Sequence, residues 1–398
     1  MKKEILYRLS IFTILIFLVS ENLRSSYIGS IAVALENAKA KYILLLLTVT
    51  LLALTNGNKI IKGKIFNNEL KCFTIAIIPL IATSIYYQLD NGYYNNTITE
   101  YLYILTPFIF SLFVIKRLPD YAERFINSCF YITSFCFLFD SLDELSLSAI
   151  ASINFAESYS PFENGLSYHF VLYELYYLFK NDKKKTFISI FFCILSLKRL
   201  CVLKAIVFYF IVKFSKNFHC NKTTYWTSII ICILIPIGLY LFYSGVGVGL
   251  LESLTNRDIN EFTMDRFRRT QFVIFASNFK NYGLGTSTLI MEGYDTLNEY
   301  GIRNLHCDAL RLLIEGTIIT TIVFTTSYFR MIEKRNLFAF LLILNLFTEI
   351  AFNHVLLGAG VTNNMILVYM LLFIFNRPYY KVVNVKFLSN EKSIIHNR

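Results

Sequence analysis

The sequence predicts an all-α, polytopic integral membrane protein with about 12 transmembrane helices and one large external loop. Three observations support this fold class. Of the 398 residues, 55% are hydrophobic and only 16% are charged, and the mean hydropathy is +0.52, unlike a soluble globular domain. Apolar runs of about 15 to 20 residues recur along the whole length, and in lipid such segments form helices because helices satisfy their own backbone hydrogen bonds. Finally, the basic residues fall mainly into alternate loops, as in a chain that crosses a membrane repeatedly.

The apolar segments set the order of the expected spans. These are residues 5–20, 41–55, 70–88, 98–115, 122–140, 164–180, 186–197, 200–214, 225–243, 307–329, 337–353 and 361–376. The first follows Lys2 and Lys3 but no small-residue cleavage site comes after it, so we interpret it as a span and not as a signal peptide. The seventh and eighth are short, and a broken hairpin or a re-entrant pair is an open alternative for them. No internal repeat divides the chain, so we treat residues 1–398 as a single membrane domain.

The positions of the charges predict the orientation. With both termini in the cytoplasm, most loops assigned to that side are rich in Lys and Arg. The opposite loops at 89–97 and 141–163 contain neither residue. We therefore expect a multi-pass membrane protein with both termini in the cytoplasm, in contact with the lipid bilayer. The net charge of +11 is accounted for by this asymmetry, and we expect no nucleic-acid partner.

Residues 244–306 form the large external loop, between the ninth and tenth spans. This loop and the Lys198–Arg199 pair place arginines on the side that otherwise lacks them. Within the loop, residues 263–279 predict an amphipathic helix capped by Thr263, with Arg266 and Arg269 three residues apart. Its apolar residues recur at i, i+3, i+4 and i+7 and are Phe272, Phe275, Ala276 and Phe279. Such a helix lies on anionic headgroups, or its guanidinium groups bind a diphosphate bidentately. Both interpretations stay open at this stage.

A second group of polar residues follows the arginines. Gly283 and Gly285 predict a turn. Asn304 is expected to cap the tenth span, which would put His306 in its first turn, where the helix dipole disfavours imidazolium. Three ionisable residues then share one face of that helix, and pairing between them would lower the cost of burying charge. They are Asp308, Arg311 and Glu315.

Other ionisable groups lie in or near apolar segments, and we interpret them as structural or as the lining of a wet cavity. They are His169, Glu174, Glu349 and His354. None of the eight cysteines forms a C-x-x-C pair, and no zinc pattern, P-loop, serine elbow or dinucleotide fingerprint is present in the sequence. We therefore expect no metal and no cofactor.

The order of these features resembles the bacterial O-antigen polymerases (Wzy) and the related O-antigen ligases. The resemblance lies in an arginine that opens an amphipathic segment, a glycine turn, and a histidine before L-R-x-L-x-E-G. Here these read Arg266, then Tyr282-Gly283-Leu284-Gly285, then His306-Cys307-Asp308 followed by 309–316. Ser196-Leu197-Lys198-Arg199 is similar to the family's arginine at the outer end of a middle span. The tryptophan after the first arginine and the proline before the glycine turn, which are common in the family, are absent here.

The resemblance implies a glycosyltransferase whose donor is an oligosaccharide linked to undecaprenyl diphosphate. In this interpretation Arg199, Arg266 and Arg269 bind the diphosphate, and His306 is the catalytic base. Secondary candidates are Lys198, Asp308, Arg311 and Glu315. A chain-length regulator is a further candidate partner.

Two alternatives remain at the level of sequence. A ligase would transfer the oligosaccharide to lipid A core in place of a second lipid-linked repeat. A flippase for lipid-linked oligosaccharide would carry its cationic residues in a central cavity between two similar halves.

Overall fold

The computed structural model describes residues 2–23, 30–31, 34, 40–54, 67–92, 95–144, 146–154, 160–215, 219–263, 266–277, 282–292, 305, 307–353, 356 and 362–376. Within these ranges the regular structure is helical, without a β-strand, and one isolated bridge joins His219 to Asn336. The predicted all-α class is confirmed.

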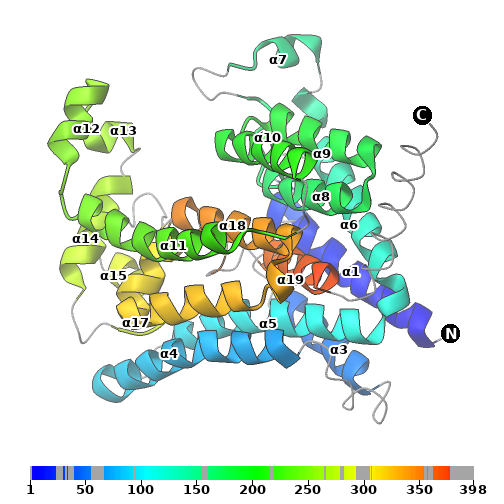
Figure 1. Ribbon diagram of the computed structural model, residues 1–398, viewed down its shortest axis with the longest axis horizontal. Helices are drawn as coiled ribbons and strands as arrows, with labels where there is room; N and C mark the ends of the chain where they lie inside the picture. The colour runs from blue at the N-terminus through cyan, green and yellow to red at the C-terminus, as the bar shows by residue number, and fades with distance from the viewer. Residues whose placement is uncertain are drawn as a thin grey trace.

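Each apolar segment predicted from the sequence corresponds to one helix (Figure 1). These helices are α1 (Lys2–Asn22), α3 (Ala40–Leu54), α4 (Asn67–Asn91), α5 (Asn95–Arg117), α6 (Ala122–Asp140), α8 (Ser167–Lys180), α9 (Lys183–Ser196), α10 (Arg199–Phe214), α11 (Lys222–Tyr243), α17 (Asp308–Arg330), α18 (Leu337–Phe352) and α19 (Thr362–Phe375). Short helices join them: η1 (Pro119–Tyr121), η2 (Leu142–Glu144), α7 (Leu147–Ala151) and η4 (Glu333–Arg335). The external loop contains α12 (Val248–Thr255), α13 (Ile259–Phe262), α14 (Arg266–Ala276) and α15 (Thr286–Glu292).

The lengths of these helices bear on the number of membrane crossings. In the described part of the chain, four helices are long and apolar enough to cross a membrane: α4, α5 from Thr97, α11 and α17. By contrast, α8, α9 and α10 have 14, 14 and 16 residues. At 1.5 Å per residue they extend only about 21 to 24 Å, less than the roughly 30 Å of bilayer hydrocarbon. The apolar helices are those of a membrane protein, but the count of twelve spans stays a prediction.

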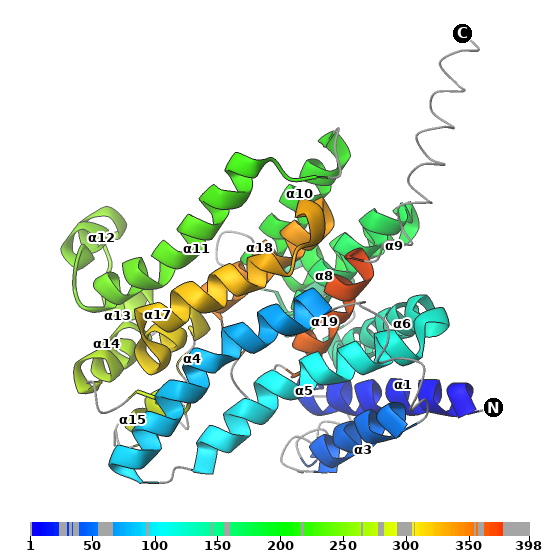
Figure 2. The same cartoon turned by 60° about the horizontal axis from the view of Figure 1, so that its bottom comes forward.

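The ends of the long helices lie at two opposite ends of the bundle, where hydrogen bonds join them to neighbouring segments (Figures 1 and 2). At one end, Thr97 at the start of α5 donates to the carbonyl of Leu284 (3.0 Å), and the N–H of Asp308 at the start of α17 donates to the carbonyl of Asn353 after α18 (3.2 Å). This is the end at which α12 to α15 lie, and we call it the insertion end. At the other end, Asn376 after α19 donates to Glu69 near the start of α4 (2.8 Å). At each end of the bundle, the start of one helix therefore lies beside the end of another, as expected when successive helices run in alternating directions.

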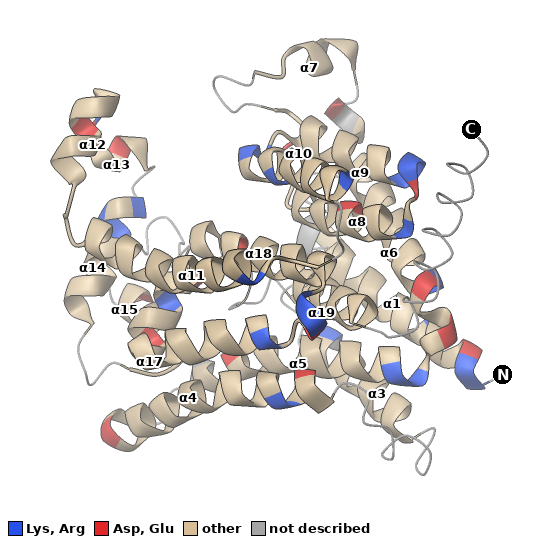
Figure 3. Cartoon of the chain, in the orientation of Figure 1, with Lys and Arg blue, Asp and Glu red and all other residues tan. Residues whose placement is uncertain are grey.

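The outward surface of the long helices is apolar. Ile78 of α4, Ile230 and Leu234 of α11 and Ile319 of α17 are 54%, 56%, 55% and 66% exposed. Lys and Arg residues are frequent at the end opposite the insertion end, and they also occur on α14 and at the start of α10 (Figure 3). An apolar belt between charged ends suits contact with lipid.

The alternation predicts that residues 244–306 lie outside the cytoplasm and that both termini lie within it. Alkaline phosphatase joined after Glu292 should therefore be active, and phosphatase joined at the C-terminus should be inactive. A fusion at Asp182, between α8 and α9, is the matched cytoplasmic control. Phosphatase activity at the C-terminus would contradict this topology.

Candidate functional site

The central helix of the external loop is α14, which begins with the predicted arginines. The backbone of Thr263 ends α13, and its hydroxyl accepts a hydrogen bond from the N–H of Phe267 in the first turn of α14 (3.1 Å). Asp265 and Phe279, at the ends of the expected helix, lie outside the described residues. The amphipathic helix predicted over 263–279 is thus confirmed for its central part, 266–276.

The face of α14 that packs on the protein is not the one formed by the predicted apolar residues. Phe275 is 69% exposed, and Phe272 and Ala276 are only half-buried. Instead, Phe267 is buried against the rings of Phe242 and Tyr243 of α11, at centroid distances of 5.5 and 5.8 Å. Other buried residues of this face are Thr270, Val273 and Ile274. The face of α14 that is buried is therefore the one that packs against the aromatic rings of α11. Phe275, on another face, is available to a membrane surface.

Arg266 and Arg269 line a small pocket at the insertion end, which we call the arginine pocket. Its other described lining residues are Tyr243, Thr270, Met291, Leu305 and Cys307. The cavity volume is about 20 Å³, enough for roughly one water molecule, so a diphosphate would lie across its mouth. The pocket brings two of the predicted diphosphate-binding residues beside the two neighbours of His306 in the chain.

His306 itself lies outside the described residues, but its relation to α17 is defined by the start of that helix. The N-cap of α17 is Cys307 and the helix begins at Asp308. The prediction that Asn304 caps the helix and that His306 stands in its first turn is therefore wrong. The reason is tertiary, because the N–H of Asp308 is already satisfied by the carbonyl of Asn353 and needs no side-chain cap.

The third predicted arginine belongs to a sharp turn between α9 and α10. Leu197 takes a left-handed conformation there (φ 48°), which is uncommon for a leucine, and Lys198 and Arg199 begin the next helix. The Lys198 ammonium lies 3.6 Å from the Glu163 carboxylate and 5.0 Å from the ring centre of Tyr168. Arg199 is exposed at the first position of α10.

Tyr168 connects this turn with the residue that follows α18, a role that the sequence did not reveal. Its hydroxyl donates a hydrogen bond to Asn353 Oδ1 (3.3 Å), and its ring lies beneath the Lys198 ammonium. Arg199 is not among the described residues that line the arginine pocket.

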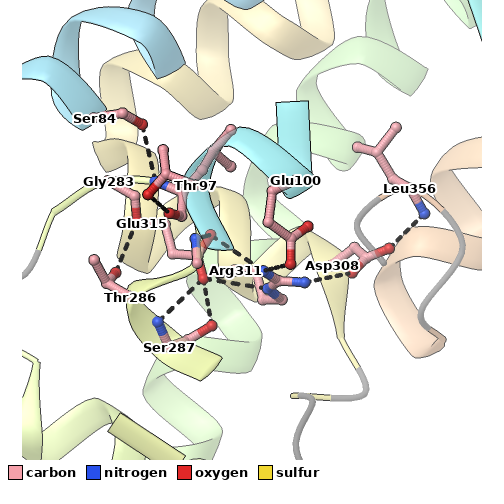
Figure 4. Close-up of polar contacts among 12 residues, drawn as sticks. Ser84, Thr97, Glu100, Gly283, Thr286, Ser287, Asp308, Arg311, Glu315 and Leu356 are labelled. Carbon is pink, nitrogen blue, oxygen red and sulfur yellow. Dashed lines mark hydrogen bonds and ion pairs between the residues drawn. The ribbon is translucent and has the colours of Figure 1, made fainter. Parts of the chain in front are cut away.

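Arg311 lies at the centre of a buried ionic network next to the pocket (Figure 4). Its guanidinium is fully buried and pairs with Glu315 (3.3 Å), Glu100 (3.3 Å) and Asp308 (4.0 Å). The expected pairing along one face of α17 is confirmed for Asp308, Arg311 and Glu315. Glu100 of α5 was missed, and its only signal in the sequence was a carboxylate within an apolar span. We call these four side chains the Arg311 network.

Glu315 holds the glycine turn in place. Its carboxylate accepts hydrogen bonds from the N–H of Gly285 (3.1 Å), the N–H of Ser287 (3.2 Å) and the Ser287 hydroxyl. Its backbone carbonyl accepts from the N–H of Gly283 (2.7 Å), beside a break in α17 at Thr317 (φ 83°). The predicted turn is confirmed, and both glycines have positive φ, 127° and 88°.

Only glycine fits at position 283. A Cβ there would lie 3.0 Å from the Cβ of Tyr87 and 3.1 Å from the Cα of Ser84, both on α4. The next residue, Leu284, donates its N–H to the Ser84 hydroxyl (3.0 Å). The turn is thus wedged between α4 and α17.

The charges of the Arg311 network show what it can do. One guanidinium faces three carboxylates, so the cluster is too negative to attract a phosphate group. Removing one partner of a buried ion pair costs about 3 to 5 kcal/mol, because a charge is left without compensation. The network is therefore suited to holding segments together, and the arginine pocket is the candidate place for an anion.

No family model matches the chain, and no curated protein matches it. Among the described residues there is also no group of three or more His, Cys, Asp and Glu side chains suited to a metal ion. A function therefore has to be assigned from the residues and their geometry.

The lining of the arginine pocket predicts that substitutions of Arg266 and Arg269 reduce activity more than a substitution of Arg268 on the same helix. Lysine keeps the positive charge but loses the two-pronged hydrogen bonding of guanidinium, so Arg266→Lys and Arg269→Lys should reduce a diphosphate-dependent activity at least about tenfold. Arg268 is exposed and is not a lining residue, so Arg268→Lys is the matched control and should stay near wild type. Activity and protein level are measured for each variant. Near-normal activity of both pocket variants would mean that α14 serves only as a membrane-surface helix.

Proposed function

We propose that the chain is an O-antigen polymerase of the Wzy type in the bacterial inner membrane. It would transfer an oligosaccharide from undecaprenyl diphosphate onto another lipid-linked repeat unit at the periplasmic face. The observation that carries the proposal is the arginine pocket, in which Arg266 and Arg269 lie beside Leu305 and Cys307, the neighbours of His306. This is the pairing of anion-binding and proton-accepting groups that the reaction needs.

In this reaction the bond between the donor sugar and the diphosphate breaks, and a bond to a hydroxyl of the acceptor sugar forms. Negative charge grows on the departing diphosphate, so guanidinium groups fixed at that place stabilise the transition state more than the ground state. Arg266 and Arg269 fit this role. Lys198, over the ring of Tyr168, and the next residue, Arg199, suit a second part of the lipid-linked substrate.

His306 is the proposed base. A neutral imidazole takes the proton of the acceptor hydroxyl as the new glycosidic bond forms, and its ordinary pKa near 6.5 suits this task at neutral pH. In the sequence His306 comes two residues before Asp308, the first residue of α17. Asp308, Arg311 and Glu315 are positioning residues, since they act by holding the start of α17 and the glycine turn.

Loss of the protein should leave lipopolysaccharide that carries a single repeat. Export and ligation of repeat units would continue while chain growth stops. Gene deletion followed by gel analysis of the lipopolysaccharide measures this, with the wild-type gene on a plasmid as the control. Bare core would indicate the ligase, and repeat units retained on the cytoplasmic face would indicate the flippase.

The base role of His306 predicts the outcome of two substitutions. His306→Ala should abolish chain growth. His306→Asn should fail nearly as badly, because asparagine hydrogen-bonds but takes up no proton near neutrality, and general-base catalysis typically contributes about a hundredfold to ten-thousandfold. The variants are assayed on lipid-linked repeats over about pH 5 to 9, which brackets the histidine reference value.

His219→Asn is the matched control, because His219 lies at the opposite end of the bundle and contacts the carbonyl of Lys334 (3.0 Å). It should leave chain growth unchanged. A His306→Asn enzyme within about tenfold of wild type would refute the base role, given the expected size of that contribution.

A further inference from the structure

A second set of buried ionisable groups lies on α8, α10 and α18. Lys204 of α10 forms an ion pair with Glu349 of α18, and the two side chains are 6% and 2% exposed. Glu174 of α8 is fully buried, and neither oxygen of its carboxyl group has a hydrogen-bond partner. A buried polar group without a partner is rare and calls for an explanation.

Glu174 lies on α8, which packs against α9 and α10 and also against α18. It lies seven residues after Ser167 and therefore on the same face of α8. The Ser167 carbonyl accepts a hydrogen bond from the Cys193 thiol of α9 (3.8 Å). The helices that carry Lys204 and Glu349 thus both pack against the helix that carries Glu174.

The helices packed against α8 bring few other charges to this region. Their buried titratable groups are Cys193, Cys201, Cys129, Cys136 and Tyr369, in addition to Lys204 and Glu349. On α8 itself, Tyr173, Tyr176 and Tyr177 flank Glu174, and the Nε2 of His169 is hydrogen-bonded to Asn363 (2.9 Å). Lys204 is therefore the one buried ammonium among the described residues of these helices.

Glu349 links this cluster to the insertion end. Its second carboxylate oxygen accepts a hydrogen bond from the Asn353 side-chain amide (2.9 Å). Asn353 in turn accepts hydrogen bonds from the Tyr168 hydroxyl and from the N–H of Asp308, at 3.3 and 3.2 Å. A shift of Glu349 would therefore be felt at Tyr168 and at the start of α17.

We propose that Glu174 is a proton-binding site in the membrane part of the chain, and that release of its proton draws Lys204 away from Glu349 and loosens Asn353. An ionised carboxylate without a donor is costly in apolar surroundings, whereas the neutral acid costs far less. In the proton-bound state Lys204 pairs with Glu349, as observed. On release, the O–H bond of the acid breaks, the proton passes to a water molecule, and the new carboxylate competes for the single ammonium.

The proton site is tested on the full-length protein in lipid nanodiscs by infrared difference spectroscopy over about pH 5 to 10, a range that spans carboxyl and lysine reference values. The C=O stretch of a protonated carboxylic acid should be present near neutral pH in the wild type and lost in Glu174→Gln. Glu144→Gln, which changes an exposed carboxylate, is the matched control and should keep the band. Absence of the band in the wild type, or its full retention in Glu174→Gln, would overturn the proposal.

The link to Asn353 is tested by hydrogen–deuterium exchange of residues 349–353 in the same samples. Above the pH at which the band disappears, exchange should be about tenfold or more faster in the wild type than in Glu174→Gln, since Gln mimics the proton-bound acid; a factor of ten corresponds to about 1.4 kcal/mol of lost protection. Equal exchange in the two proteins would refute the coupling. Neither readout uses glycosyl transfer, so both stay decisive if the proposed polymerase activity is wrong.

Discussion

The full burial of the Arg311 guanidinium is the constraint on which the insertion end depends. A charge enclosed in protein has to be paired, and here the carboxylates come from two helices, Asp308 and Glu315 from α17 and Glu100 from α5. Two of these carboxylates also accept backbone N–H groups, Glu315 from the glycine turn and Asp308 from Leu356 (2.6 Å). Four segments that are distant in the sequence are therefore fixed by one charge, because moving any of them would leave a buried group unpaired.

The network and the arginine pocket are adjacent, and their charges are opposite. Ser287 and Met291, one helical turn apart on α15, contact Glu315 and line the pocket respectively. Cys307 lines the pocket and the next residue, Asp308, belongs to the network. The excess of carboxylates disfavours entry of an anion into the network. Positive charge without this excess is found next to it, where Arg266 and Arg269 line the pocket.

The sequence was sufficient wherever local chemistry decides the structure. Apolar runs became helices, the Thr263 hydroxyl accepted a hydrogen bond from the first turn of α14, the glycines made the turn, and i, i+3 and i+7 spacing placed Asp308, Arg311 and Glu315 on one face. It failed where a distant segment decides. Glu100 is 211 residues from Arg311, and no spacing rule joins them. The buried face of α14 follows from rings on α11, and the start of α17 follows from the Asn353 carbonyl, so periodicity and cap preferences gave the wrong answer at both places.

The short helices also set the depth at which two of the other buried ionisable groups lie. Lys204 lies five residues into α10 and Glu174 seven residues into α8, so at 1.5 Å per residue they stand about 8 and 11 Å below the helix starts at the insertion end. Ionisable groups at such depths lie closer to water than groups at the centre of a bilayer, and their desolvation cost is correspondingly lower. Helices of only 14 to 16 residues keep this region thin. A proton that reaches Glu174 from the insertion end would therefore travel only about two helical turns, along the side of the bundle that carries Tyr168, Asn353 and Glu349.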